Sequence, residues 1–289
     1  MTVLISYDVE AASIGEGVAG INTGRERYEK SLDRSSTSKA LEMITDIHSK
    51  YEAPFTTFVT GKTLLQSVEP YKKAVRELGK LMDVEQHTFS HVQFKDISFE
   101  PSQGEVISYP AGTYELLEQE VKSANEAVER TLGWKCKGIR TPFCYWQGLR
   151  GEKKKLGLLR ANGLKFVSSF ARNRKGGQPT PWVQPYTYAE EGFPELVELP
   201  VQNWFDGIWY STYGWENTEG FKKLYRKNLD YVRRKNLVWG IVFHEWILVE
   251  QNEPRTRVVE DFVRYAKEKG EEMLTNLQFS DDFRKSAGR

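Results

Sequence analysis

The chain has 289 residues, 39% of them hydrophobic, which is ample apolar material for a core. Its 41 basic and 40 acidic residues give a formal net charge of +1, so no overall field points to nucleic acid or to an anionic membrane surface as a partner. The only cysteines, Cys136 and Cys144, are too few for a disulfide framework and are expected to be reduced. No signal peptide and no run of roughly 18 apolar residues is visible, so we expect a cytoplasmic protein without a membrane span.

Short β-like runs alternate along the chain with segments of helical periodicity. Strands are predicted at residues 3–7, 55–60, 82–86, 137–139, 165–170, 196–201 and 237–243. Helices are predicted at about 36–51, 70–80, 115–132, 152–162, 220–235 and 255–269. The helix at 115–132 is expected to turn Leu116, Leu117 and Val121 inward and to end at Gly133. A polar, glycine-bearing loop is expected at about 11–36.

About seven alternations of strand and helix occur without a break in composition, which favours one α/β domain over residues 1–289. The pattern predicts a parallel sheet that is closed or nearly closed into a barrel. The segments near 92–114 and 171–194 are long for simple connections, so they are expected to be rim insertions beside a functional site.

The segment HTFSH places two of the four histidines of the chain, His87 and His91, four positions apart. Two imidazoles at this spacing can reach one metal ion. By spacing alone, such a pair on a helix face is more often solvated or packed.

Four polar residues follow or end predicted strands, namely Asp8, His87, Arg140 and His244. In a parallel barrel the carboxyl ends of the strands meet at one rim, so these side chains are expected to converge there. Glu10 stands two residues beyond Asp8, so both carboxylates would face the same way from an extended segment. One carboxylate would complete a two-histidine, one-carboxylate metal site and the other would act as a base; alternatively both cap the following turn.

Arg140 and His244 each have a functional and a structural interpretation. Arg140 pairs with and orients a buried carboxylate in the first, and forms an ordinary ion pair in the second. His244 closes the apolar run GIVFH, where it is the natural general acid or a packed core histidine. His48 lies beside apolar positions of a predicted helix and is interpreted as structural.

Taken in order, these segments resemble the polysaccharide deacetylase family, the NodB-homology carbohydrate esterases. The similarity spans almost the whole chain: the matching segments are SYDVE, SKYEAPFTTFVTG, HTFSH, LEQEVKSANEAVERTLGWKCKGIRTPF and IVFH. HTFSH matches the full H-(S/T)-x-x-H metal motif of the family. The resemblance implies a deformed (β/α)7 TIM-like barrel that hydrolyses N-acyl or related amide bonds with a divalent metal.

Carried onto this chain, the resemblance implies that Asp8 is the catalytic base and that His87 and His91 are metal ligands. Arg140 would tether Asp8, His244 would be the general acid, and the backbone N–H of Phe143 would contribute to the oxyanion hole. The metal is expected to be zinc, with cobalt or nickel as alternatives.

Two motifs depart from the commonest pattern of the family. Val9 replaces the second of two adjacent aspartates, so the carboxylate ligand is assigned to Glu10, as in a D-x-D or D-x-E branch. The aspartate that normally orients the acid histidine is also missing, because Ser168 and Ser169 stand at that place. Asp206 is a candidate substitute.

The substrate is predicted less sharply. Residues near the motifs that are suggested as sugar contacts are Trp146, Trp204, Trp209, Trp246 and Asp206. The preferred function is removal of an N-acyl group, N-acetyl above all, from a carbohydrate or sugar conjugate. A cyclic imide or ureide hydrolase and a carbohydrate-binding barrel without catalysis are the alternatives, and the oligomeric state is left open.

Overall fold

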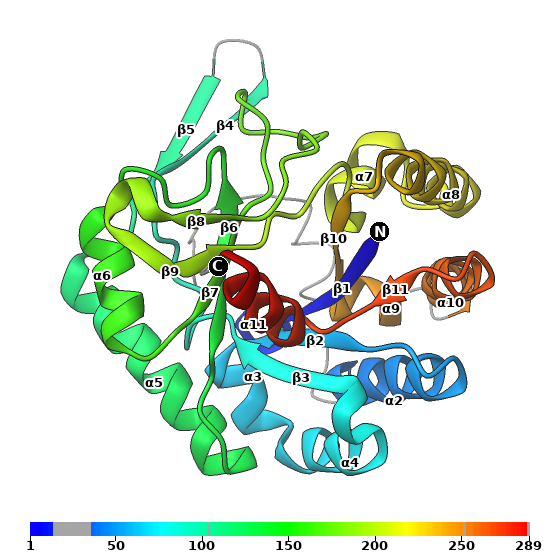
Figure 1. Ribbon diagram of the computed structural model, residues 1–289, viewed down its shortest axis with the longest axis horizontal. Helices are drawn as coiled ribbons and strands as arrows, with labels where there is room; N and C mark the ends of the chain where they lie inside the picture. The colour runs from blue at the N-terminus through cyan, green and yellow to red at the C-terminus, as the bar shows by residue number, and fades with distance from the viewer. Residues whose placement is uncertain (14–35, 103–104, 251–252, 288–289) are drawn as a thin grey trace.

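A computed structural model of the chain describes residues 1–13, 36–102, 105–250 and 253–287. The polar loop predicted at 11–36 therefore lies mostly outside the described residues. Parallel strands occupy the centre, and most of the helices surround them (Figure 1). No helix of the described part is long and apolar enough to cross a membrane.

Seven parallel strands form the wall of a deformed barrel, which confirms the predicted fold. They are β1 (Thr2–Val9), β2 (Phe55–Val59), β3 (Met82–Gln86), β6 (Gly138–Tyr145), β7 (Phe166–Phe170), β9 (Phe193–Glu198) and β10 (Val238–His244). Strands β1, β2, β3, β6, β7 and β9 are neighbours in that order, and β10 pairs with the free edge of β1.

The wall is incomplete between β9 and β10, where no strand pairing is formed. Gln202, just beyond β9, spans this opening: its backbone N–H donates to the Gly240 carbonyl at 3.1 Å, and its side-chain oxygen accepts the Gly240 N–H at 2.6 Å. A side chain at Gly240 would collide with the Pro200 carbonyl oxygen, so glycine permits this close approach. Hydrogen bonds from Gln202, and from Gln184 to Val238, thus bridge this opening without a strand ladder.

The helices around the wall bury apolar faces against the strands. They are α2 (Ser36–Lys50), α3 (Gly61–Gln66), α4 (Val68–Leu78), α5 (Tyr114–Leu132), α6 (Lys153–Ala161), α7 (Asp206–Tyr213), α8 (Thr218–Lys235), α9 (Glu245–Glu250), α10 (Glu253–Glu268) and α11 (Asn276–Ala287). Short 3-10 helices lie at Ala11–Ser13, Gly79–Leu81 and Ala189–Glu191. The C-terminal helix α11, which the sequence patterns did not predict, packs near the amino ends of the strands, where Leu277 and Phe283 contact a cluster that contains Leu4 and Phe166.

Three details of the predicted elements were wrong, the first being the strand predicted at 196–201, which lies at Phe193–Glu198. Leu116 was expected inside but is 40% exposed, because it lies about 100° around α5 from Leu117, which is fully buried. The strand predicted at 137–139 continues to Tyr145, so Arg140 lies within β6.

The two long segments contain strands of their own. In the first, β4 (Ile97–Ser102) and β5 (Glu105–Tyr109) form an antiparallel hairpin that projects from the barrel (Figure 1). In the second, β8 (Tyr186–Tyr188) pairs with the outer edge of β9. A last short strand, β11 (Glu272–Met273), pairs with β1.

Candidate metal and amide-hydrolysis site

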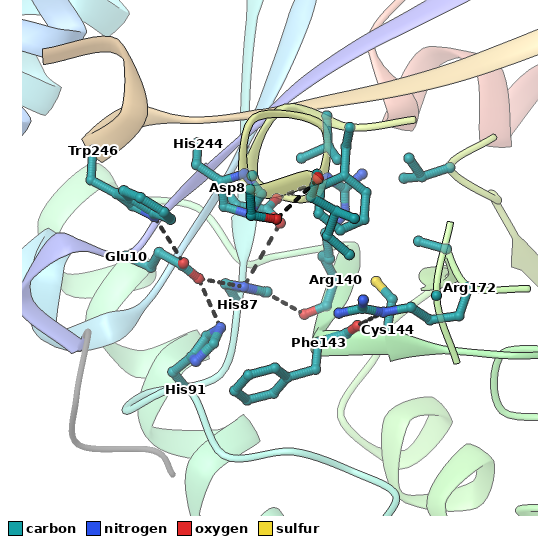
Figure 2. A pocket seen from close by; sticks show the side chains of 18 of the residues that line it. Asp8, Glu10, His87, His91, Arg140, Phe143, Cys144, Arg172, His244 and Trp246 are labelled. Atoms are coloured by element: carbon teal, nitrogen blue, oxygen red, sulfur yellow. Dashed lines mark hydrogen bonds and ion pairs between the residues drawn. The ribbon is translucent and has the colours of Figure 1, made fainter. Parts of the chain in front are cut away.

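A cavity of about 540 Å³ opens at the carboxyl ends of the parallel strands. Asp8 of β1, Arg140 of β6 and His244 of β10 line it, together with His87, which follows β3 directly (Figure 2). The side chains expected to converge on one rim therefore do so, because parallel strands bring their carboxyl ends to the same end of the barrel.

Glu10, His87 and His91 form a buried cluster of three metal-ligating side chains. The Oε2 atom of Glu10 lies 2.7 Å from His91 Nε2 and 3.2 Å from His87 Nε2. The three ligating atoms all lie within 4.8 Å of one another, and each residue is at most 3% exposed. A carboxylate oxygen and two imidazole nitrogens are donors that suit zinc and neighbouring divalent metals, so the residues fit the ion implied by the histidine motif.

A hydrogen bond to the Arg140 backbone fixes the orientation of the His87 ring. Its Nδ1 donates to the Arg140 carbonyl oxygen at 2.8 Å, which turns Nε2 toward Glu10. His91 reaches the same carboxylate from a loop rather than from a helix, with positive φ angles at Thr88 (59°) and His91 (69°). Residues other than glycine seldom adopt this conformation and do so mainly where the surroundings enforce it.

One of those enforcing contacts is made by Glu120 of α5. Its two carboxylate oxygens accept the backbone N–H and the hydroxyl of Ser90, each at 2.7 Å. Ser90 directly precedes His91, and Glu120 is only 6% exposed. The carboxylate therefore clamps the loop that carries the second histidine.

Glu10 is supported on both its side chain and its backbone. Trp246 Nε1 donates to Oε1 at 3.1 Å, which leaves Oε2 directed at the histidines (Figure 2). Behind it, the buried Oε1 of Glu245 accepts the backbone N–H groups of Glu10 and Ala11, each at 2.6 Å. Burial raises the pKa of Glu10, but the charge of His91 and hydrogen bonds from both histidines outweigh burial and hold that pKa well below its usual value.

Asp8 is held beside this cluster by a buried ion pair. Its Oδ1 accepts from Arg140 Nη1 at 2.8 Å, and its Oδ2 lies 3.9 Å from both His87 Nε2 and His244 Nε2. Arg140 also donates to Ser6 and Ser168 and lies over the ring of Phe58. One oxygen of Asp8 is therefore anchored and the other faces the centre of the site.

His244 is bound to Asp206, the first residue of α7. His244 Nδ1 lies 2.6 Å from Oδ1 of Asp206, and the His244 backbone N–H donates to Oδ2 at 2.7 Å. Burial alone would lower the pKa of His244, but the carboxylates of Asp206, Glu10 and Asp8 raise it to about 9. Such a histidine holds a proton at neutral pH with Nε2 directed into the cavity.

Phe143 and Cys144 interrupt β6 with positive φ angles of 66° and 50°. The ring of Phe143 packs 4.9 Å from that of His91, and its carbonyl oxygen accepts from Arg172 Nε at 3.0 Å. Phe143, whose backbone N–H the resemblance assigns to the oxyanion hole, lines the cavity beside the metal-ligand cluster.

The suggested sugar contacts do not all reach this cavity. Trp246 lines it, whereas Trp146 packs against Phe170, and Trp204 and Trp209 pack against one another. Asp206 contacts His244 instead of the open cavity. The sequence patterns missed Glu120, Glu245 and Arg172, which the fold brings to the site from distant segments and which no local motif marks.

Comparisons with known proteins relate part of the sequence to one family and the whole chain to one fold. Residues 31–162, which include both histidines of the cluster and Arg140, match the family model for polysaccharide deacetylase. No curated protein matches the sequence.

Three solved structures with similar folds represent different activities. A Mycobacterium smegmatis protein assigned as a polysaccharide deacetylase is 18% identical, with a TM-score of 0.68 over 99% of this chain and 90% of that one. The PuuE allantoinase is 10% identical, with a TM-score of 0.66 over 96% and 89%. A family 4 carbohydrate esterase pseudoenzyme from Bacillus anthracis is 12% identical, with a TM-score of 0.50 over 96% and 65%.

At these identities the structural similarities establish the fold, and the family model supplies the sequence relationship. Together they relate the chain, through residues 31–162, to the polysaccharide deacetylase family, whose enzymes are hydrolases that act on carbon–nitrogen bonds.

Proposed function

We propose that the protein is a metal-dependent amide hydrolase that removes an N-acyl group, N-acetyl in the first instance, from a carbohydrate or sugar conjugate. The observation that carries the proposal is the buried cluster of Glu10, His87 and His91, with Asp8 and His244 beside it at one cavity. A ligand set, a base and an acid within one site are what hydrolysis of an amide requires.

Glu10, His87 and His91 would hold the ion. A bound divalent metal supplies Lewis acidity, which polarises a carbonyl and makes water a better nucleophile at neutral pH. Two histidines and one carboxylate are a common set for catalytic zinc, so zinc is proposed first, with cobalt and nickel as alternatives.

Asp8 would accept the proton of the attacking water. Arg140 holds one carboxylate oxygen at 2.8 Å and so directs the other toward the site. Because Asp8 and Glu10 are two residues apart in an extended segment, their side chains face the same way. One short segment would therefore supply both the base and a ligand.

His244 would donate a proton to the departing nitrogen. Its bond to Asp206 fixes the ring and favours the protonated imidazole, which a general acid needs at the start of the reaction. The Phe143 N–H would stabilise the developing oxyanion, a contribution that in other hydrolases is worth about 100- to 1,000-fold in rate.

Hydrolysis of a cyclic imide or ureide is the second candidate. Two observations favour it. The carboxylate of the metal-ligand cluster comes from Glu10, one residue beyond the usual position, which Val9 occupies here, and the fold is similar to that of an allantoinase. The same base, metal ligands and acid would open a ring amide, so these residues alone do not select between an acyl chain and a ring.

A substrate screen with metal analysis separates the proposals. The protein is loaded with zinc, cobalt or nickel, its metal content is measured, and N-acetylated sugars are assayed beside hydantoin and allantoin. Release of acetate supports the deacetylase, and ring opening alone supports the second candidate. Metal-loaded protein that binds N-acetylated sugars but turns over no amide would instead be a non-catalytic barrel, and the hydrolase proposal would be overturned.

A further inference from the structure

Arg172 is a cation in the wall of the cavity that the proposed mechanism does not use. It follows β7 by two residues and, in Figure 2, lies on the opposite side of the site from Glu10 and Trp246. Arg140, the other arginine of the same wall, is paired with Asp8. Arg172 lines the same cavity but makes no such ion pair within the described residues.

The position of Arg172 is defined by two contacts that leave part of its guanidinium unused. Nε donates to the Phe143 carbonyl oxygen at 3.0 Å, and the guanidinium carbon lies 5.6 Å from the centre of the Phe205 ring. Within the described residues, Arg172 has no ion pair, and neither terminal nitrogen has a hydrogen-bond partner. The guanidinium is thus oriented, but its charge is not balanced.

Arg172 is half-buried and has apolar neighbours. An apolar cluster, formed by Ala171, Val201, Phe205 and Val242, lies beside it along the cavity. Burial lowers the pKa of the Arg172 guanidinium, although an arginine keeps its proton at physiological pH. A cation in such surroundings is stabilised by an anion that enters the cavity, because exposure to bulk water is already reduced.

We propose that Arg172 binds a carboxylate of the amide substrate, so that the preferred substrates carry an acidic group beside the amide that is hydrolysed. The inference rests on the proposed function and adds the substrate class to it. A carboxylate is favoured over a phosphate because the one positive charge of Arg172 balances its single negative charge, and the planar guanidinium can bind it with two parallel hydrogen bonds.

The size of the cavity agrees with such a substrate. A volume of about 540 Å³ is far more than an acetyl group needs and is in the range of sites for whole small molecules. The metal-ligand cluster and Arg172 occupy different parts of this one cavity, with the apolar cluster adjoining Arg172. An elongated ligand would place its amide at the metal-ligand cluster and its carboxylate at Arg172.

Matched substrate pairs test the inference on both candidate substrate classes, the N-acetylated sugars and the cyclic imides. N-acetylglucosamine is compared with N-acetylmuramic acid, and hydantoin with hydantoin-5-acetic acid; within each pair the acidic member carries an added carboxylate. Arg172→Met keeps an unbranched apolar side chain but removes the charge. We expect the acid-to-neutral ratio of kcat/KM to fall by about 10- to 100-fold in the substrate class that is turned over, as expected for loss of hydrogen bonds between charged groups.

The ratio isolates the carboxylate contact from other effects of the substitution. Arg172→Met also removes the bond to Phe143, but any resulting loss of catalysis affects both members of a pair equally. Arg174→Met is the matched control, because Arg174 is in the same loop, is exposed and does not line the cavity. It should leave the ratio unchanged, and thermal unfolding checks that both variants are folded.

A binding measurement keeps the inference separate from the proposed function. The four compounds are titrated into the zinc-loaded protein and its Arg172→Met variant and followed by NMR. Selective binding of an acidic member that Arg172→Met abolishes supports the inference even when nothing is hydrolysed, and then only the proposed function fails. An unchanged ratio, or no preference of the native protein for either acidic member, would overturn the inference.

Discussion

His244 and the carboxylate of Asp206 are joined twice, through the imidazole Nδ1 at 2.6 Å and through the His244 backbone N–H at 2.7 Å. This pairing joins the end of β10 to the start of α7, two elements that meet only in the folded chain. Ser168 and Ser169, which stand where the family usually has its orienting aspartate, are engaged elsewhere, with Arg140 and Glu198. A carboxylate from another segment thus contacts the histidine instead.

Substitution Asp206→Asn should lower the pKa of His244. The native pKa is about 9 because nearby carboxylates, Asp206 foremost, outweigh the opposing effect of burial. If His244 is the general acid, the alkaline loss of kcat should then begin at a lower pH, since the acid must be protonated to act. NMR titration of the imidazole and a kcat–pH profile measure both effects. Asp282→Asn, at an exposed residue of α11, is the control, and an unchanged His244 pKa would contradict the prediction.

Replacement of Glu10 by glutamine should weaken metal binding. The carboxylate contacts both His87 and His91, and an amide at this position has no negative charge to offer the ion. Because loss of partners outside the ligand shell already costs about 10- to 100-fold in metal affinity, we expect a loss above about 100-fold here. Competition with a chelator measures it. Undiminished affinity for zinc would remove Glu10 from the ligand set.

The neighbouring substitution Asp8→Asn should separate catalysis from metal binding. Asp8 is anchored by Arg140 and keeps its other oxygen 3.9 Å from His87, so we expect zinc affinity to change little. A base contributes about 100- to 10,000-fold to such reactions, and kcat should fall within that range. Single-turnover rates at saturating zinc test this. If Asp8→Asn removes the metal while Glu10→Gln retains it, the two roles are exchanged.

These residues show what a sequence pattern can and cannot predict here. The proximity of Asp8, His87 and His244 could be predicted because each residue follows or ends a strand, and parallel strands meet at their carboxyl ends. Glu120 could not, because its contact with Ser90 depends on a loop with positive φ angles at Thr88 and His91 that no local propensity favours.

The fold was predicted to a similar degree. Helices separate the parallel strands everywhere except between β7 and β9, so most of the elements give clear periodic signals. The bridge from Gln202 to Gly240 and the packing of α11 near Leu4 are long-range contacts. Hydrophobic periodicity contains no information about such contacts. Prediction of burial within a single helix was also incomplete, because Leu116 is apolar but lies off the buried face of α5.

The clamp that Glu120 forms on Ser90 should matter for metal binding as well as for stability. Glu120→Ala removes both acceptors of the half-buried Ser90, and because hydrogen bonds to a charged group contribute about 1.5–3 kcal/mol, the free energy of unfolding should fall by about that amount. The loop that carries His91 would loosen, so we expect zinc affinity to fall by about 10- to 100-fold. Glu120→Gln keeps one acceptor and should retain most of both properties. Calorimetric zinc titration and urea unfolding test this, and equal zinc affinity in all three proteins would exclude a positioning role.

The buried His48 should make the protein sensitive to mild acid. Its Nδ1 donates to the Ala53 carbonyl at 2.7 Å, and its Nε2 accepts from the Tyr7 hydroxyl at 2.8 Å, so the neutral ring is fully bonded. Burial lowers the pKa of His48 from 6.5 to about 4. Between these values the unfolded chain binds a proton that the folded chain does not, so stability is lost as the pH falls from about 6.5 toward 4.

The shift corresponds to about 3 kcal/mol in the free energy of unfolding at its full extent. Urea unfolding at pH 7.0 and at pH 4.5, compared between the native protein and His48→Phe, isolates this contribution because phenylalanine does not titrate. The variant should be less stable at pH 7.0, since it leaves the Tyr7 hydroxyl and the Ala53 carbonyl without their partner. It should nevertheless lose less stability than the native protein on acidification. Equal losses in both proteins would show that His48 is already protonated in the fold, or that its proton affinity does not change on folding.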